Sequence, residues 1–198
     1  MKRRVAVGGG VVAAAALIGL GEYWMISREA GPSLGGGGIG GAFRLVDTDG
    51  RRFTERDLRG KPAMIYFGFT FCPEVCPTTL THMSSWLHEL GPQAAGLRTV
   101  FVTVDPERDT VPKLKQYLSG FDSRIIGLTG TPAEVAAIAR DYKVYYKKVP
   151  LPDGSYTMDH SSLVYLMDAK GQLAGLIAYD EPNAKALAAL RALLGGQT

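Results

Sequence analysis

Residues 63–77 read AMIYFGFTFCPEVCP, an apolar run that leads into two cysteines, each followed by a proline. Residues 63–69 show no polar face, which is the pattern of a β-strand buried on both sides. Downstream, apolar residues recur at helical spacing over residues 78–90. The cysteines therefore lie between the carboxyl end of a buried strand and a helix, at the edge where open α/β sheets bind ligands.

The rest of the chain alternates between strand and helix patterns around this unit. An Asp-Gly turn predicts a hairpin at residues 43–54, and Thr131-Pro132-Ala133-Glu134 is typical of a capped helix start. The alternation predicts an α/β fold with a central, mixed but mostly parallel sheet, flanking helices and added hairpins. The further elements that we expect are strands at 99–104, 124–128, 144–149 and 162–167, a hairpin return at 173–179, and helices at 111–118, 131–142 and 181–194.

The prolines constrain the cysteines. Pro73 and Pro77 each disfavour helical geometry in the preceding residue, so we expect the helix to begin at or after Pro77 and both cysteines to lie on a loop. Free N–H groups and the helix dipole at that end favour thiolate over thiol. Cys72 and Cys76 can therefore act as a redox pair or hold one soft ion. Inert thiols or a permanent disulfide are the alternatives, although so short a loop gains little stability from a disulfide.

Two thiolates are an incomplete site for most metals, and the three histidines of the chain are the candidates for a further ligand. His82 and His88 lie six residues apart on the expected helix and are interpreted as solvated surface residues. His160 lies in a loop before an expected strand, where a neutral imidazole can complete a site suited to Cu(I) and Cu(II). A surface loop histidine is the alternative. Met158 is interpreted as packing rather than as a ligand.

Three motifs together resemble the Sco (SenC) family: CPEVCP at 72–77, DPERD at 105–109, and DHS at 159–161 before a strand that contains Tyr165. The likeness covers nearly all of residues 42–198. It implies a thioredoxin-like fold and one copper ion, Cu(I) or Cu(II), held by Cys72, Cys76 and His160. It also implies a role near the metal for Asp105, which is otherwise a strand-end turn former.

The resemblance implies a function as well. Sco proteins deliver copper to the CuA site of cytochrome c oxidase subunit II, reduce the cysteines of that site, or do both. The expected partners are therefore subunit II and a copper-donor chaperone. Asp159, beside His160, is expected to support the ligands together with Asp105. Candidates for an apolar docking rim are Phe69, Phe71, Val75 and Tyr156, of which Phe69 is better explained by core packing.

Other functions use the same residues. A thiol–disulfide oxidoreductase on this fold needs the same cysteine pair, but its usual spacing is two intervening residues rather than three. Thioredoxins also carry a cis-proline where this chain has Asp159-His160, which favours a metal. A peroxiredoxin is disfavoured, because that family places threonine where Phe69 stands. A redox signalling module acting on a membrane sensor remains open.

The N-terminus predicts where the domain works. Lys2-Arg3-Arg4 precedes an uncharged run from 5 to 21, so residues 1–27 are expected to be an uncleaved membrane anchor with its start in the cytoplasm. A cleaved signal peptide is the alternative. Residues 28–41 are a glycine-rich linker. We therefore expect a single-pass protein of the inner membrane whose domain, residues 42–198, lies in the periplasm.

Composition limits the remaining function classes. The 198 residues are 46% hydrophobic and 21% charged, which is ordinary for a folded protein. Two cysteines cannot form a disulfide-dense scaffold or a four-thiolate zinc site. The net charge of +3 includes a surplus of two positive charges within residues 1–30, so the domain is nearly neutral. We expect no nucleic-acid partner, because such surfaces need clustered positive charge.

Overall fold

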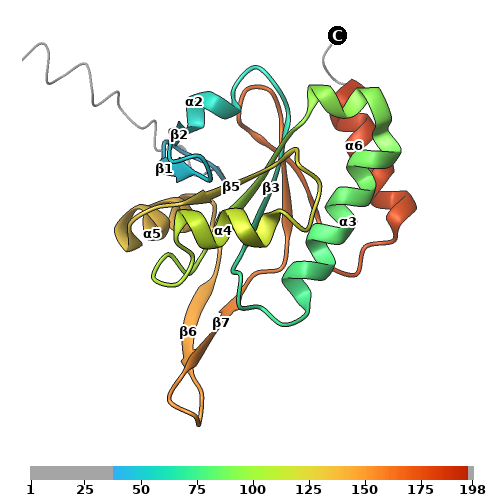
Figure 1. The fold of residues 1–198 in the computed structure, drawn as a ribbon. Coiled ribbons are helices and arrows are strands. Elements are labelled where there is room, and N and C mark those ends of the chain that lie inside the picture. The colour runs from blue at the N-terminus through green and yellow to red at the C-terminus, as the bar shows by residue number, and fades with distance from the viewer. Residues whose placement is uncertain (1–37, 196–198) are drawn as a thin grey trace, which may run out of the picture. The chain divides into compact units, whose positions relative to one another are not determined.

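The apolar run forms β3 (Ala63–Gly68), a fully buried strand inside a seven-stranded sheet. The computed structural model describes residues 38–195, which are drawn in colour in Figure 1. The strand order is β2-β1-β5-β4-β3-β8-β9. The strands are β1 (Arg44–Asp47), β2 (Arg52–Thr54), β4 (Arg98–Thr103), β5 (Ile125–Thr129), β8 (Val164–Met167) and β9 (Leu173–Ile177).

The sheet is mixed, as predicted, but its parallel part is confined to the centre. Strands β3, β4 and β5 run parallel to one another. The pairings β1–β2, β1–β5, β3–β8 and β8–β9 are antiparallel. The strands are parallel where a helical connection joins them, in the β–α–β units at 63–103 and 98–129. The hairpins β1–β2 and β8–β9 add antiparallel strands at the two edges of the sheet.

Helices cover both faces of this sheet. Tyr66 faces Cys76 on α3 (Val75–Leu90), whereas its neighbour Phe67 packs on Tyr142, directly after α5 (Pro132–Asp141). Adjacent strand residues point to opposite faces, so α3 and the end of α5 lie on opposite sides. The other helices are α2 (Glu55–Leu58), α4 (Val111–Leu118), α6 (Asn183–Gly195) and the 3-10 helix η1 (Gly91–Gly96).

One strand was not expected. Residues after the turn at 151–155 form β7 (Tyr156–His160), which pairs with β6 (Tyr146–Pro150) in a separate two-stranded hairpin. Figure 1 shows this hairpin extending away from the rest of the domain. His160 is therefore the last residue of a strand, not part of a loop as predicted.

The predicted anchor at 1–27 and most of the linker at 28–41 lie outside the described residues. Within residues 38–195, no helix combines the length and the apolar character that crossing a membrane requires.

Candidate metal centre

Three side chains from separate parts of the chain converge at the carboxyl end of β3. The Sγ atoms of Cys72 and Cys76 and a ring nitrogen of His160 all lie within 4.8 Å of one another. Cys72 is on the loop after β3, Cys76 is in the first turn of α3, and His160 ends β7. Cys76 is fully buried, while Cys72 and His160 are partly accessible. This is a half-open cluster of two sulfurs and one nitrogen.

The helix begins earlier than predicted, at Val75 instead of at or after Pro77. Proline is tolerated in the first helical turn, because the N–H it lacks would have no partner inside the helix. This early start puts Cys76 in the first turn, where its backbone N–H points out of the helix. That N–H lies 3.3 Å from Cys72 Sγ and donates a hydrogen bond to it. The helix end therefore stabilises negative charge on Cys72, the effect expected from the sequence.

Two residues that sequence reasoning missed shape the pocket around Cys76. The Tyr66 hydroxyl donates a hydrogen bond to Cys76 Sγ at 3.5 Å. Gly68 leaves the space that the sulfur occupies, because a Cβ at this position would lie 2.9 Å from Cys76 Sγ and 2.9 Å from Phe101. Glycine inside a buried strand is a sequence signal for such a close approach.

His160 presents one defined nitrogen to the sulfurs. Its Nδ1 lies 3.0 Å from the backbone oxygen of Ser161, and only a protonated Nδ1 can donate to that oxygen. Nε2 then carries the lone pair and faces Cys76 Sγ at 3.4 Å. The ring packs edge-on against Phe69 with centroids 5.7 Å apart. Hydrogen bonding at the far nitrogen fixes the tautomer that a metal ligand requires.

The pKa values of the two thiols are shifted in opposite directions. A hydrogen bond from the Cys76 side chain, helped by the backbone N–H groups of Cys76 and Glu74, lowers the pKa of Cys72 to about 4 against the opposing effect of burial. The pKa of Cys76 is raised, first because its proton is held in the bond to Cys72 and second because it is buried. Cys72 is thus the accessible thiolate and Cys76 the buried thiol.

This asymmetry predicts how the reduced, metal-free protein reacts with iodoacetamide. Because the pKa of Cys72 lies far below neutrality, its alkylation rate should stay nearly flat between about pH 6 and pH 9. In urea the same residue should react about tenfold faster for each pH unit, up to about pH 8.5. Mass spectrometry of the peptides gives both rates, with Cys76 modified last. A tenfold rise per pH unit in the folded protein would show that Cys72 is an ordinary thiol.

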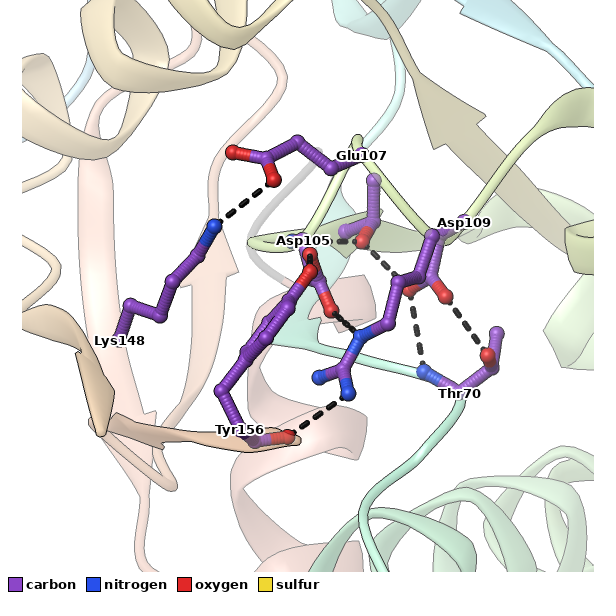
Figure 2. A network of polar contacts seen from close by, with 8 residues as sticks. Thr70, Asp105, Glu107, Asp109, Lys148 and Tyr156 are labelled. Atoms are coloured by element: carbon purple, nitrogen blue, oxygen red, sulfur yellow. Dashed lines mark hydrogen bonds and ion pairs between the residues drawn. The ribbon is translucent and has the colours of Figure 1, made fainter. Parts of the chain in front are cut away.

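Asp105 lies in a buried network beside the cluster rather than on the ligands. Figure 2 shows its carboxylate next to Tyr156, whose hydroxyl donates to Asp105 Oδ1 at 2.9 Å. Arg108 Nε donates to the other oxygen. Among the described residues, no hydrogen bond joins Asp105 to the three clustered side chains. Any support that it gives to the site passes through these two partners.

Asp159 is not brought to the cluster. It is exposed and stands opposite Lys147 in the hairpin register. Successive strand residues point to opposite faces, so His160 faces the cysteines only if Asp159 faces away. The expectation that Asp159 supports the ligands rested on adjacency in the sequence, which a strand converts into opposite orientation.

Asp109 is a further functional candidate that was not singled out. It is fully buried and accepts hydrogen bonds from the Thr70 backbone N–H at 3.0 Å, from the Thr70 hydroxyl at 2.6 Å and from the Thr103 hydroxyl at 2.6 Å. Burial raises its pKa despite these bonds. Asp109 therefore fixes the chain two residues before Cys72, as the dashed lines to Thr70 in Figure 2 show.

The comparisons with known proteins agree with this geometry. The profile of the SCO1/SenC family matches residues 32–195. The chain belongs to the SCO1/SenC family. Bradyrhizobium japonicum ScoI, solved with copper bound, is 46% identical with a TM-score of 0.74, over 78% of this chain and 99% of that one. Yeast Sco1 with copper bound is 37% identical with a TM-score of 0.75, over 81% and 91% of the two chains.

A curated SCO1/SenC relative gives the same result at sequence level. Protein SCO1 homolog 1, mitochondrial, from Arabidopsis thaliana is 43% identical over 143 residues, which is 72% of this chain and 43% of that protein. The chain spans about half the length of the mitochondrial relatives that it matches. The predicted thioredoxin-like fold is confirmed by the solved Sco structures.

The remaining residues considered from the sequence are either buried in the core of this Sco domain or exposed on its surface. Phe69 is 1% exposed and belongs to the core, as preferred from the sequence, and Met158 is buried packing. His82 and His88 are exposed on α3.

Phe71 is 51% exposed next to Cys72, and with Tyr156 and Leu151 it lines an open groove of about 590 Å³. Val75 is half-buried.

Proposed function

We propose that this protein binds one copper ion through Cys72, Cys76 and His160 and delivers it to the CuA site of cytochrome c oxidase subunit II. The observation that carries the proposal is the approach of the three ligand atoms to within 4.8 Å of one another. Two Sγ atoms and an imidazole nitrogen are a soft set that suits Cu(I) and is compatible with Cu(II). The solved copper-bound relatives support the same metal.

The thiols make copper binding depend on redox state. Ligation needs both sulfurs as thiolates, so a Cys72–Cys76 disulfide and a bound copper ion exclude each other. The low pKa of Cys72 supplies one thiolate without cost at neutral pH, whereas Cys76 must release its proton as the metal enters. Copper uptake therefore releases protons and requires a reduced protein.

Accessibility determines where the metal leaves. Cys76 is buried against Tyr66 and Gly68, while Cys72 is partly exposed beside the exposed ring of Phe71. An acceptor thiolate can therefore approach the copper ion from the Cys72 side rather than past the buried Cys76. Transfer then proceeds by exchange of Cys72 for an acceptor cysteine, with His160 and Cys76 released afterwards.

The cellular setting of the proposal follows the sequence. Residues 1–27 anchor the protein in the inner membrane, residues 28–41 act as the tether, and the domain faces the periplasm. A copper-donor chaperone loads it there. In that compartment the domain meets the CuA site of subunit II.

A transfer assay tests this function. Cu(I)-loaded protein mixed with reduced, metal-free CuA domain should lose its copper to that domain, and metal analysis of the separated proteins measures the transfer. Cys72→Ser protein should give none. If no copper moves but an oxidised CuA domain gains two thiols while a Cys72–Cys76 disulfide forms, the alternative is correct. The protein is then a thiol–disulfide reductase, which the partly exposed, low-pKa Cys72 beside a resolving Cys76 also favours.

A further inference from the structure

The third ligand of the cluster stands on an element outside the main sheet. His160 ends β7, and among the strands of residues 38–195 β7 pairs only with β6. Figure 1 shows this hairpin, β6 with β7, extending from the domain. The seven-stranded sheet therefore fixes the cysteines through β3, but its ladder does not fix the hairpin strand that carries His160.

One face of β7 turns toward the body of the domain. Tyr156, Met158 and His160 alternate along the strand and so share a face. Met158 is 7% exposed, and the His160 ring packs on Phe69 and Tyr66. A contact that holds Tyr156 therefore sets the tilt of the same face that presents His160.

Arg108 makes that contact. Its Nη1 donates to the Tyr156 backbone oxygen at 2.7 Å, and its guanidinium lies 3.7 Å from the centre of the Tyr156 ring. The same guanidinium is 4.5 Å from the ring centre of Phe71, the residue before Cys72. Arg108 thus lies between the ring that precedes one sulfur ligand and the strand that carries the nitrogen ligand.

Arg108 is itself held in place by the residues around it. Arg108 is paired with the buried carboxylate of Asp105, and the Arg108 side chain itself is only 19% exposed. Asp105 also accepts from the Tyr156 hydroxyl, and the neighbouring Asp109 holds Thr70 through two hydrogen bonds. A second ion pair, Lys148 Nζ to Glu107 Oε2 at 2.7 Å, joins the hairpin to the same 105–109 loop, as Figure 2 shows.

We infer that Arg108 is a positioning residue, which holds the β6–β7 hairpin against the cysteine loop and so keeps His160 Nε2 aimed at the two sulfurs. The inference rests on the proposed function, since the importance of that aim depends on copper binding. Lysine cannot replace Arg108, because the planar guanidinium bonds Asp105, bonds the Tyr156 carbonyl and stacks on two rings at once.

The test measures Cu(I) affinity, by competition with a chromophoric chelator, and the EPR spectrum of the Cu(II) form, using full-length protein. Arg108→Lys and Arg108→Gln should each weaken Cu(I) binding by about 10- to 100-fold, the range for partners that orient a ligand. Nitrogen hyperfine splitting should fade while the thiolate-to-copper absorption persists. Arg124→Gln breaks a comparable arginine–aspartate pair with Asp122, away from the site, and should change neither quantity.

A double-mutant cycle separates positioning from general damage. If Arg108 acts through His160, adding Arg108→Gln to His160→Ala should cost no further affinity. Additive losses would overturn the inference, and so would an Arg108 variant that binds copper like wild type. Tyr156→Ala leaves the Asp105–Arg108 pair in place and should lose less Cu(I) affinity than the Arg108 variants. This variant provides the test if the Arg108 variants do not fold.

Hydrogen exchange of the metal-free protein gives an independent readout. In Arg108→Gln the cross-strand amides of β6 and β7 should lose protection by about tenfold or more, while those of β3 and β4 keep theirs. Unchanged hairpin protection contradicts the inference even if copper affinity falls. If wild type itself takes up no copper, the proposed function fails, and the exchange data still decide whether Arg108 holds the hairpin.

Discussion

Cys76→Ser should abolish specific copper binding. The affinity for copper should fall by more than about 100-fold, which is the largest loss expected when a residue that only orients a ligand is changed. Cys76 is fully buried, and its sulfur faces His160 Nε2 at 3.4 Å and the Tyr66 hydroxyl at 3.5 Å. A serine oxygen in that pocket is a hard ligand that stays protonated at neutral pH, so the site keeps only one thiolate and one imidazole. Isothermal or chelator-competition titration of the reduced protein measures the loss.

Thr79→Ser is the matched control for this variant. Thr79 is also buried in the first part of α3, and its hydroxyl donates to the Val75 oxygen at 2.8 Å, a bond that serine keeps. This variant should bind copper as wild type does. Copper affinity of Cys76→Ser within tenfold of the control would mean that Cys76 is not a ligand.

Gly68→Ala should reduce both the stability of the domain and its affinity for copper. The added Cβ would lie 2.9 Å from Cys76 Sγ and 2.9 Å from Phe101, and neither neighbour is a flexible surface chain. Overpacking of a buried strand costs about 1–3 kcal/mol in the free energy of unfolding. Relief of the clash moves Cys76 away from His160, so the copper site is distorted as well.

Gly175→Ala provides the comparison, because Gly175 lies in β9 of the same sheet and a Cβ there would meet only Leu166, at 3.8 Å. Urea unfolding should place this variant at or slightly above wild-type stability, since alanine restricts the unfolded chain. Equal unfolding free energies for the two alanine variants would show that the close approach at Gly68 does not constrain the site.

The sequence was sufficient for the sheet centre and for the identity of the three clustered residues. Long apolar runs such as 63–69 allow little choice of structure, and the motif containing Cys72 and Cys76 is local. The helix start was misplaced because the restriction that Pro77 imposes was given more weight than its tolerance in a first turn.

The missed strand β7 left a signal in the sequence. Tyr156, Met158 and His160 alternate with Thr157 and Asp159, and a turn-forming PDGS segment at 152–155 precedes them. Recognition of that alternation would have placed Asp159 outward and His160 inward. The role inferred for Arg108 had no such signal, because its contacts with Phe71 and Tyr156 join segments 37 and 48 residues away.

The central claim is that the converging side chains form one redox-gated copper site, and a titration of the reduced and oxidised forms tests it most directly. Reduced protein should bind one equivalent of Cu(I), with X-ray absorption showing two sulfur neighbours and one nitrogen. His160→Ala should lose the nitrogen, whereas His82→Ala, on the exposed face of α3, should keep it. Protein with the Cys72–Cys76 disulfide should bind none. Equal copper uptake by the reduced and disulfide forms would contradict the claim.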